Sequence, residues 1–113
     1  MSEIEGVQGV GDSKEYSKEE LQKYQEDYQK GLDIFKKSFQ EYSKKDIEDH
    51  KKKAMENVMK EALQVMNETA CVALKEGKQG TNKALNTDFH SYVNDRSPEN
   101  KDKVLDDIKT LSE

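Results

Sequence analysis

The sequence has 113 residues, a hydrophobic fraction of 32%, a charged fraction of 38% and a formal net charge of -5. The length suits one domain, and the polar composition predicts a thin core of the kind that helical hairpins and coiled coils tolerate. The acidic balance disfavours nucleic-acid binding. No apolar stretch approaches the ~20 residues that span a membrane, so we expect neither a nucleic acid nor a membrane as a partner. The single cysteine and the lack of a signal-peptide pattern predict a cytoplasmic protein, although export without a conventional signal peptide stays open.

The first 15 residues carry three glycines among small and acidic residues, with neither helical nor strand periodicity. We predict a flexible tail over residues 1–15 and a single helical domain over residues 16–113. Ser17 and Glu20 have the spacing of a capping box, in which each side chain bonds to the backbone amide of the other residue. Ordered structure is therefore predicted to begin at Ser17.

A long amphipathic helix is predicted over about residues 17–43. Apolar residues recur at steps of three and four from Leu21 to Tyr42, close to the spacing of a heptad repeat. Gly31 lies inside this pattern and costs about 1 kcal/mol relative to alanine. We interpret Gly31 as a tolerated residue rather than as the mark of a close helix approach.

A second helix is predicted over about residues 46–76. The apolar stripe changes phase after Tyr42, and Asp46 is a competent N-cap, which together place a tight turn at residues 43–45. That turn contains neither glycine nor proline, so one continuous helix with a shifted apolar face is an alternative. The later half of this helix has a broad apolar face that includes Cys71, which we interpret as a core residue and not as a nucleophile.

Two shorter helices are predicted over about residues 82–94 and 98–112. Gly77 is the expected C-cap of the preceding helix, and Ser97 followed by Pro98 is typical of a helix start. No segment alternates as a strand does. The sequence thus predicts an all-α fold: a long antiparallel helical hairpin with two short C-terminal helices, forming a three- to four-helix bundle with coiled-coil-like packing.

Aromatic and methionine side chains on the first two helices are the candidate functional residues. The rings are a large share of all the apolar area in this chain, and the second helix offers too little apolar surface to cover them, which favours self-association or a bound helix. The candidate partner-binding residues are Tyr24, Tyr28, Phe35, Phe39, Tyr42, Met55 and Met59. This pattern predicts a non-enzymatic protein-protein interaction module with helical partners, acting as an adaptor, a small chaperone or a self-assembling homo-oligomer.

Catalytic, cofactor and metal sites are not predicted. His50 and His90 have no metal-binding spacing, and the helix-cap role explains the acids at Asp46 and Asp49 beside His50. A metal-binding or catalytic helical bundle built on these residues or on Cys71 is the alternative from a different class.

The polar start and the Ser97–Pro98 turn give the chain a format that resembles the small helical-hairpin proteins exported by bacterial secretion machines. This resemblance implies an exported subunit or its escort chaperone as a further alternative. The segment from Pro98 to Glu113 is shorter than the polymerising helix of needle-type subunits, and the chain lacks the tryptophan of the Trp-x-Gly hairpin family.

Overall fold

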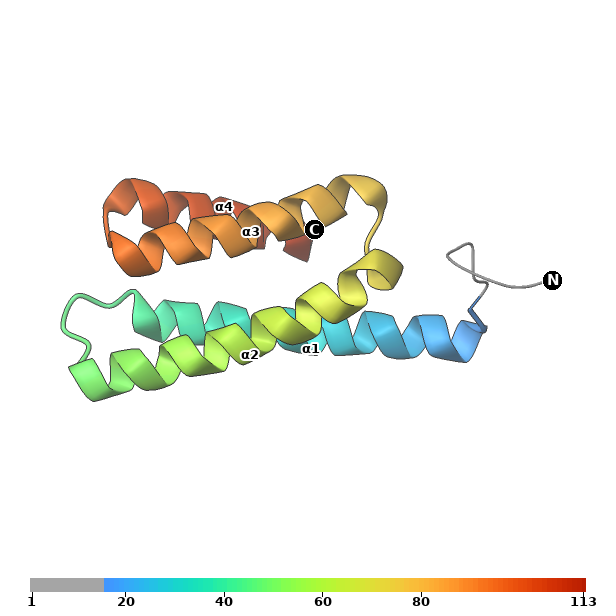
Figure 1. Ribbon diagram of the computed structural model, residues 1–113, viewed down its shortest axis with the longest axis horizontal. Helices are drawn as coiled ribbons and strands as arrows, with labels where there is room; N and C mark the ends of the chain where they lie inside the picture. Colours follow the sequence, from blue (N-terminus) through green and yellow to red (C-terminus); the bar gives the residue numbers. More distant parts are fainter. Residues whose placement is uncertain (1–15) are drawn as a thin grey trace.

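The computed structural model describes residues 16–113, which form four α-helices and no strand (Figure 1). The helices are α1 (Lys18–Tyr42), α2 (Asp49–Ala73), α3 (Glu76–Asn94) and α4 (Pro98–Ser112). The predicted all-α class is confirmed, whereas the predicted tail over residues 1–15 lies outside the described residues. Between residues 16 and 113, none of the helices combines the length and the apolar character needed to cross a membrane.

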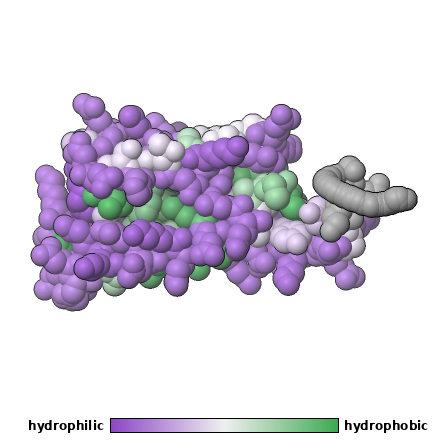
Figure 2. Space-filling model, in the orientation of Figure 1, coloured by the Kyte–Doolittle hydropathy of each residue, from purple (hydrophilic) through white to green (hydrophobic). Residues whose placement is uncertain are grey.

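The helices form two stacked hairpins. α1 and α2 make the first antiparallel hairpin, and α3 and α4 make the second, which covers one face of the first (Figure 1). Apolar side chains from all four helices form one core between the hairpins. Hydrophobic side chains are visible along the seam between the hairpins, within a mainly hydrophilic surface (Figure 2). The bundle is therefore closed by its own C-terminal helices.

The predicted capping box at the start of α1 is confirmed. The Ser17 Oγ accepts a hydrogen bond from the Glu20 amide, and the Ser17 amide donates to Glu20 Oε1, both at 3.1 Å. Each bond satisfies an amide that the first turn of a helix leaves without a partner. Residues close together in the sequence are sufficient for this feature.

The connection between α1 and α2 is a turn, so the alternative of one continuous helix is wrong. The turn runs from residue 43 to residue 48, and the second helix begins at Asp49 with Glu48, not Asp46, as its N-cap. Arg96 Nη2 donates to the carbonyl oxygens of Tyr42 (2.8 Å) and Lys44 (3.5 Å). A side chain from the loop between α3 and α4 thus satisfies backbone carbonyls at the end of α1 and holds the turn in a longer form than the sequence predicted.

The prediction that Gly77 ends the second helix is wrong. α2 ends at Ala73, the backbone of Leu74 is extended (φ -111°, ψ 146°), and α3 already begins at Glu76. The Gln79 side chain donates to the carbonyl oxygens of Leu74 (3.0 Å) and Cys71 (3.3 Å), so these carbonyls at the end of α2 are satisfied without a glycine cap. Residues 77–81, which separate the two predicted helices, are accordingly part of α3.

Gly31 marks a close approach of α1 and α2, contrary to the prediction that it is merely tolerated. A Cβ atom at this position would lie 3.0 Å from Met66 Cγ and 3.1 Å from the carbonyl oxygen of Ala62. Both distances are shorter than ordinary van der Waals contact, and one involves the backbone of α2. The absence of a side chain at Gly31 therefore sets how closely the two long helices pack.

Candidate functional site

Most of the predicted partner-binding residues lie in the core of the bundle. Tyr28 is 3% exposed, and Phe35, Phe39, Tyr42 and Met59 are fully buried. Met55 is partly buried against the same core, and Tyr24 is half-buried near the N-terminal end of α1. The five buried side chains have no free surface to offer a partner while both hairpins stay together.

Rings from α3 cover the aromatic face of α1. The ring centroids of Phe35 and Phe89 are 5.2 Å apart in an edge-to-face arrangement, and those of Phe39 and Tyr92 are 5.3 Å apart. The second helix alone was expected to be too thin to cover this face, and α3 supplies the missing cover. That expectation compared α1 with α2 alone, whereas two aromatic residues of the shorter α3 complete the core.

Arg96 joins this aromatic cluster to the turn after α1. The guanidinium carbon lies 4.6 Å from the Tyr42 ring centroid and 5.2 Å from that of Tyr92, both within the range of cation–π attraction. The Tyr42 hydroxyl donates to Glu56 Oε2 at 2.9 Å. Burial and then the bond to Glu56 raise the pKa of Tyr42 to about 12, against the lowering effect of Arg96. The cluster therefore links the two hairpins through contacts of Arg96 with Tyr42 and Tyr92.

A polar network connects α1, α2 and α3 near the other end of the bundle. The Tyr28 hydroxyl donates to Asn82 Oδ1 at 3.0 Å, and Asn82 Nδ2 donates to Asn67 Oδ1 at 2.9 Å. Asn67 also exchanges hydrogen bonds with Asn86. Burial raises the pKa of Tyr28, so its hydroxyl stays protonated as a donor. These side chains satisfy one another and leave the network without a reactive group.

The histidine and cysteine side chains that were weighed as metal ligands or as a nucleophile lie apart from one another. Among residues 16–113, no group of three or more histidine, cysteine, aspartate or glutamate side chains could hold a metal ion. His50 and His90 are exposed on different helices. Cys71 is exposed, so its prediction as a core residue is wrong; it lies one position beyond Ala70, which does face the core.

Two carboxyl groups face each other between α3 and α4. Burial, then a hydrogen bond and charge repulsion from Asp88, and repulsion from Asp106, raise the pKa of Asp107 to about 7. The Asp107 Oδ2 is buried and receives no hydrogen bond from an N–H or hydroxyl group of residues 16–113. We therefore expect this pair to make the stability of the protein depend on pH.

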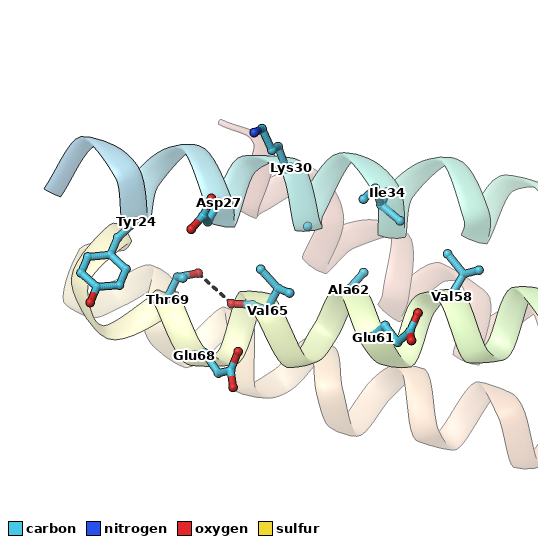
Figure 3. A pocket seen from close by; sticks show the side chains of 11 residues that line it. Tyr24, Asp27, Lys30, Ile34, Val58, Glu61, Ala62, Val65, Glu68 and Thr69 are labelled. Carbon is cyan, nitrogen blue, oxygen red and sulfur yellow. Dashed lines mark hydrogen bonds between the residues drawn. The ribbon is translucent and has the colours of Figure 1, made fainter. Parts of the chain in front are cut away.

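The outer face of the first hairpin carries an apolar groove. It has a volume of about 610 Å³ and is lined by α1 and α2 alone, on the side away from the second hairpin (Figure 3). Its lining residues are Tyr24, Asp27, Lys30, Gly31, Ile34, Val58, Glu61, Ala62, Val65, Glu68 and Thr69. Ile34 is 47% exposed and Val65 is 38% exposed, which makes them two of the four large hydrophobic side chains that residues 16–113 expose.

Small residues create the hollow of the groove. Gly31 on α1 and Ala62 on α2 lie at its floor, where a Cβ atom at Gly31 would be 3.1 Å from the Ala62 carbonyl oxygen. Ile34, Val58 and Val65 form apolar walls on either side (Figure 3). Tyr24 is the one predicted partner-binding residue that lines this groove. The sequence prediction named only aromatic and methionine side chains, so it passed over Ile34, Val58 and Val65.

The rim of the groove is acidic. Asp27, Glu61 and Glu68 contribute three negative charges and Lys30 one positive charge, which leaves an excess of two negative charges. Asp27 points from α1 towards α2, whereas the amino group of Lys30 points away from the groove (Figure 3). An apolar floor between carboxylates suits a ligand that is apolar on one face and positively charged beside it.

Comparisons with known proteins add no family or relative to this description. No model of a known protein family matches the chain, and no curated protein sequence or solved structure matches it.

Proposed function

We propose that the protein is a non-enzymatic protein-interaction module that binds a helix of its partner in the groove between α1 and α2. The observation that carries this proposal is the exposure of Ile34 and Val65 beside the hollow at Gly31 and Ala62. Burial of exposed apolar side chains is the main driving force when an amphipathic helix enters a groove of this kind. An adaptor, a small chaperone and an assembly subunit would all use such a surface.

The dimensions of the groove support a helical ligand. From Tyr24 to Ile34 the groove follows α1 for about 15 Å, at about 1.5 Å of rise per residue. Three helical turns cover the same distance and present apolar side chains at positions i, i+3 or i+4, and i+7. Within residues 16–113, the two other exposed large hydrophobic side chains lie on different helices: Leu21 is near the start of α1, and Leu105, at 40% exposure, lies on α4 beside the charged residues Lys36 and Lys109.

Peptide selection against the full chain tests this function. A displayed library of amphipathic helices is selected on the wild-type protein alone, and the affinity of each selected peptide is then measured on the wild-type protein and on the Ile34→Asp/Val65→Asp variant. Both changes are at exposed positions, so we expect the free energy of unfolding to change by less than about 1 kcal/mol in total. The Leu105→Asp variant is the matched control, with similar exposure on a different helix.

We expect selected peptides to bind the wild-type protein and the Leu105→Asp control alike, and to lose at least about ten-fold in affinity on the groove variant. Peptides that bind the wild-type protein and the groove variant equally, or a library that yields no binder, contradict the proposal. Light scattering of the wild-type protein over a range of concentrations measures its molar mass. A mass that rises to that of a dimer identifies a second copy of the chain as the occupant, and a constant monomer mass points to a different partner.

A further inference from the structure

The charge distribution around the groove specifies the kind of helix that it accepts. We infer that the groove binds an amphipathic helix whose apolar face is flanked by lysine or arginine side chains; this inference rests on the proposed function. The apolar face packs on Ile34, Val58 and Val65, and the flanking cations contact the rim carboxylates of Asp27, Glu61 and Glu68. Arginine suits these contacts because its guanidinium can pair with a carboxylate through two hydrogen bonds.

The placement of the carboxylates favours this orientation. Glu61 and Glu68 are seven residues apart on α2, which is two helical turns or about 10 Å along one side of the groove. Cations at positions i and i+7 of a bound helix have the same separation. Asp27 lies on the opposite helix and faces into the gap (Figure 3), so a helix in the groove has carboxylates on both sides.

Two other occupants are disfavoured by charge. The N-terminal residues 1–15 contain four carboxylates and one lysine, so they share the sign of the rim. A second copy of the chain has a formal net charge of -5, and two facing grooves would bring the rim carboxylates of both copies together. Like charges opposed across an interface are unfavourable, whereas opposite charges accelerate association and improve specificity.

Two synthetic peptides of about 14 residues test the inference, since this length forms nearly four helical turns and so spans the three turns that the groove covers. Both peptides carry leucine at positions i, i+4 and i+7 and have blocked ends; one has lysine and arginine at the flanking positions, and the other has glutamate. Fluorescence anisotropy measures their affinities for the full chain at low and at physiological ionic strength. Methyl NMR spectra of Ile34, Val58 and Val65 report whether the peptide lies in the groove.

We expect the cationic peptide to bind at least about ten-fold more tightly than the anionic peptide, with a difference that shrinks as salt is added. The Glu61→Gln/Glu68→Gln variant should lose most of this preference, while the control Glu99→Gln/Asp102→Asn, on the exposed side of α4, should retain it. Methyl signals of the groove should shift on binding, and those of Leu105 should not.

Every other outcome contradicts either the charge specificity of the groove or its role as a helix-binding site. Equal binding of both peptides, with shifts in the groove, overturns the charge specificity and leaves the groove as a helix-binding site. Binding of the cationic peptide without groove shifts, or with full retention on the Ile34→Asp/Val65→Asp variant, is surface adsorption and overturns the inference. If neither peptide binds and the library described above also yields no binder, both the inference and the proposed function fail.

Discussion

Arg96 and Tyr42, which are 54 residues apart in the sequence, meet through two interactions: Arg96 Nη2 donates to the Tyr42 carbonyl oxygen at 2.8 Å, and the guanidinium lies over the Tyr42 ring. The only arginine of the chain thus caps the end of α1 and stacks between rings of α1 and α3. A positive charge near the C-terminal end of a helix also interacts favourably with the helix dipole. Arg96 is therefore the residue that fixes the second hairpin to the turn of the first.

Replacement of Arg96 should destabilise the protein although the residue is not in the apolar core. We expect Arg96→Lys to lower the free energy of unfolding by about 1–2 kcal/mol, because an ammonium cannot stack and cap at the same time, and Arg96→Ala by about 2–3 kcal/mol. Urea denaturation followed by circular dichroism measures both. Lys103→Ala, at an exposed position on α4, is the control and should change stability by less than about 0.5 kcal/mol; a similar loss in both would contradict the role of Arg96.

Gly31→Ala should destabilise the protein in spite of the better helix propensity of alanine. Overpacking against Met66 and the Ala62 carbonyl costs about 1–3 kcal/mol, and the propensity gain offsets about 1 kcal/mol of this. The control is Gly80→Ala on α3, where a Cβ meets no atom within 4 Å. Thermal unfolding should show a lower midpoint for the first variant and a higher one for the second. An increase for both would show that α1 and α2 separate without cost.

Tyr28→Phe should lower stability by about 1–2 kcal/mol. The change removes the donor to Asn82 Oδ1 and leaves that buried acceptor unsatisfied, while the ring keeps its packing. Tyr24→Phe is the matched control, because the Tyr24 hydroxyl makes no hydrogen bond to the other residues of the described range and the ring is half-buried. Equal effects of the two changes in chemical denaturation would rule out a stabilising role for the asparagine network.

The Asp88–Asp107 pair should make stability fall as the pH rises from about 4 to about 7. The folded protein retains the Asp107 proton up to about pH 7, whereas the unfolded chain releases it near the ordinary value of 3.8. The folded state therefore binds the proton more tightly, and its stability decreases through this window and is lowest above it.

The variant Asp107→Asn should remove most of this pH dependence, since an amide is neutral at every pH and can donate to Asp88. Solvent screens part of the repulsion around this half-buried pair, so we expect a gain on the order of 1 kcal/mol at pH 8 that disappears near pH 4. Denaturation at a series of pH values measures the difference. Parallel pH profiles for the variant and the wild type would show that another group is responsible.

Local signals in the sequence were sufficient for the helices that begin with strong caps. Ser17 with Glu20, and Ser97 with Pro98, act within one turn of backbone, and both predicted helix starts are present in the structure. The apolar periodicity from Leu21 to Tyr42 likewise predicted α1 almost to the residue. These features depend on neighbours in the chain, so the sequence alone determines them.

The boundaries of α2 and α3 and the position of the groove were decided by contacts between residues far apart in the sequence. Arg96 and Gln79 satisfy carbonyls at the ends of α1 and α2, and no local pattern predicts which distant side chain will reach them. Likewise, whether Gly31 is tolerated or required depends on the distance to α2, and whether Phe35 and Phe39 are free or buried depends on Phe89 and Tyr92. The sequence by itself determined the helices and their apolar faces. Tertiary packing decided which apolar side chains stay exposed, because burial is a property of the assembled bundle and not of any one helix.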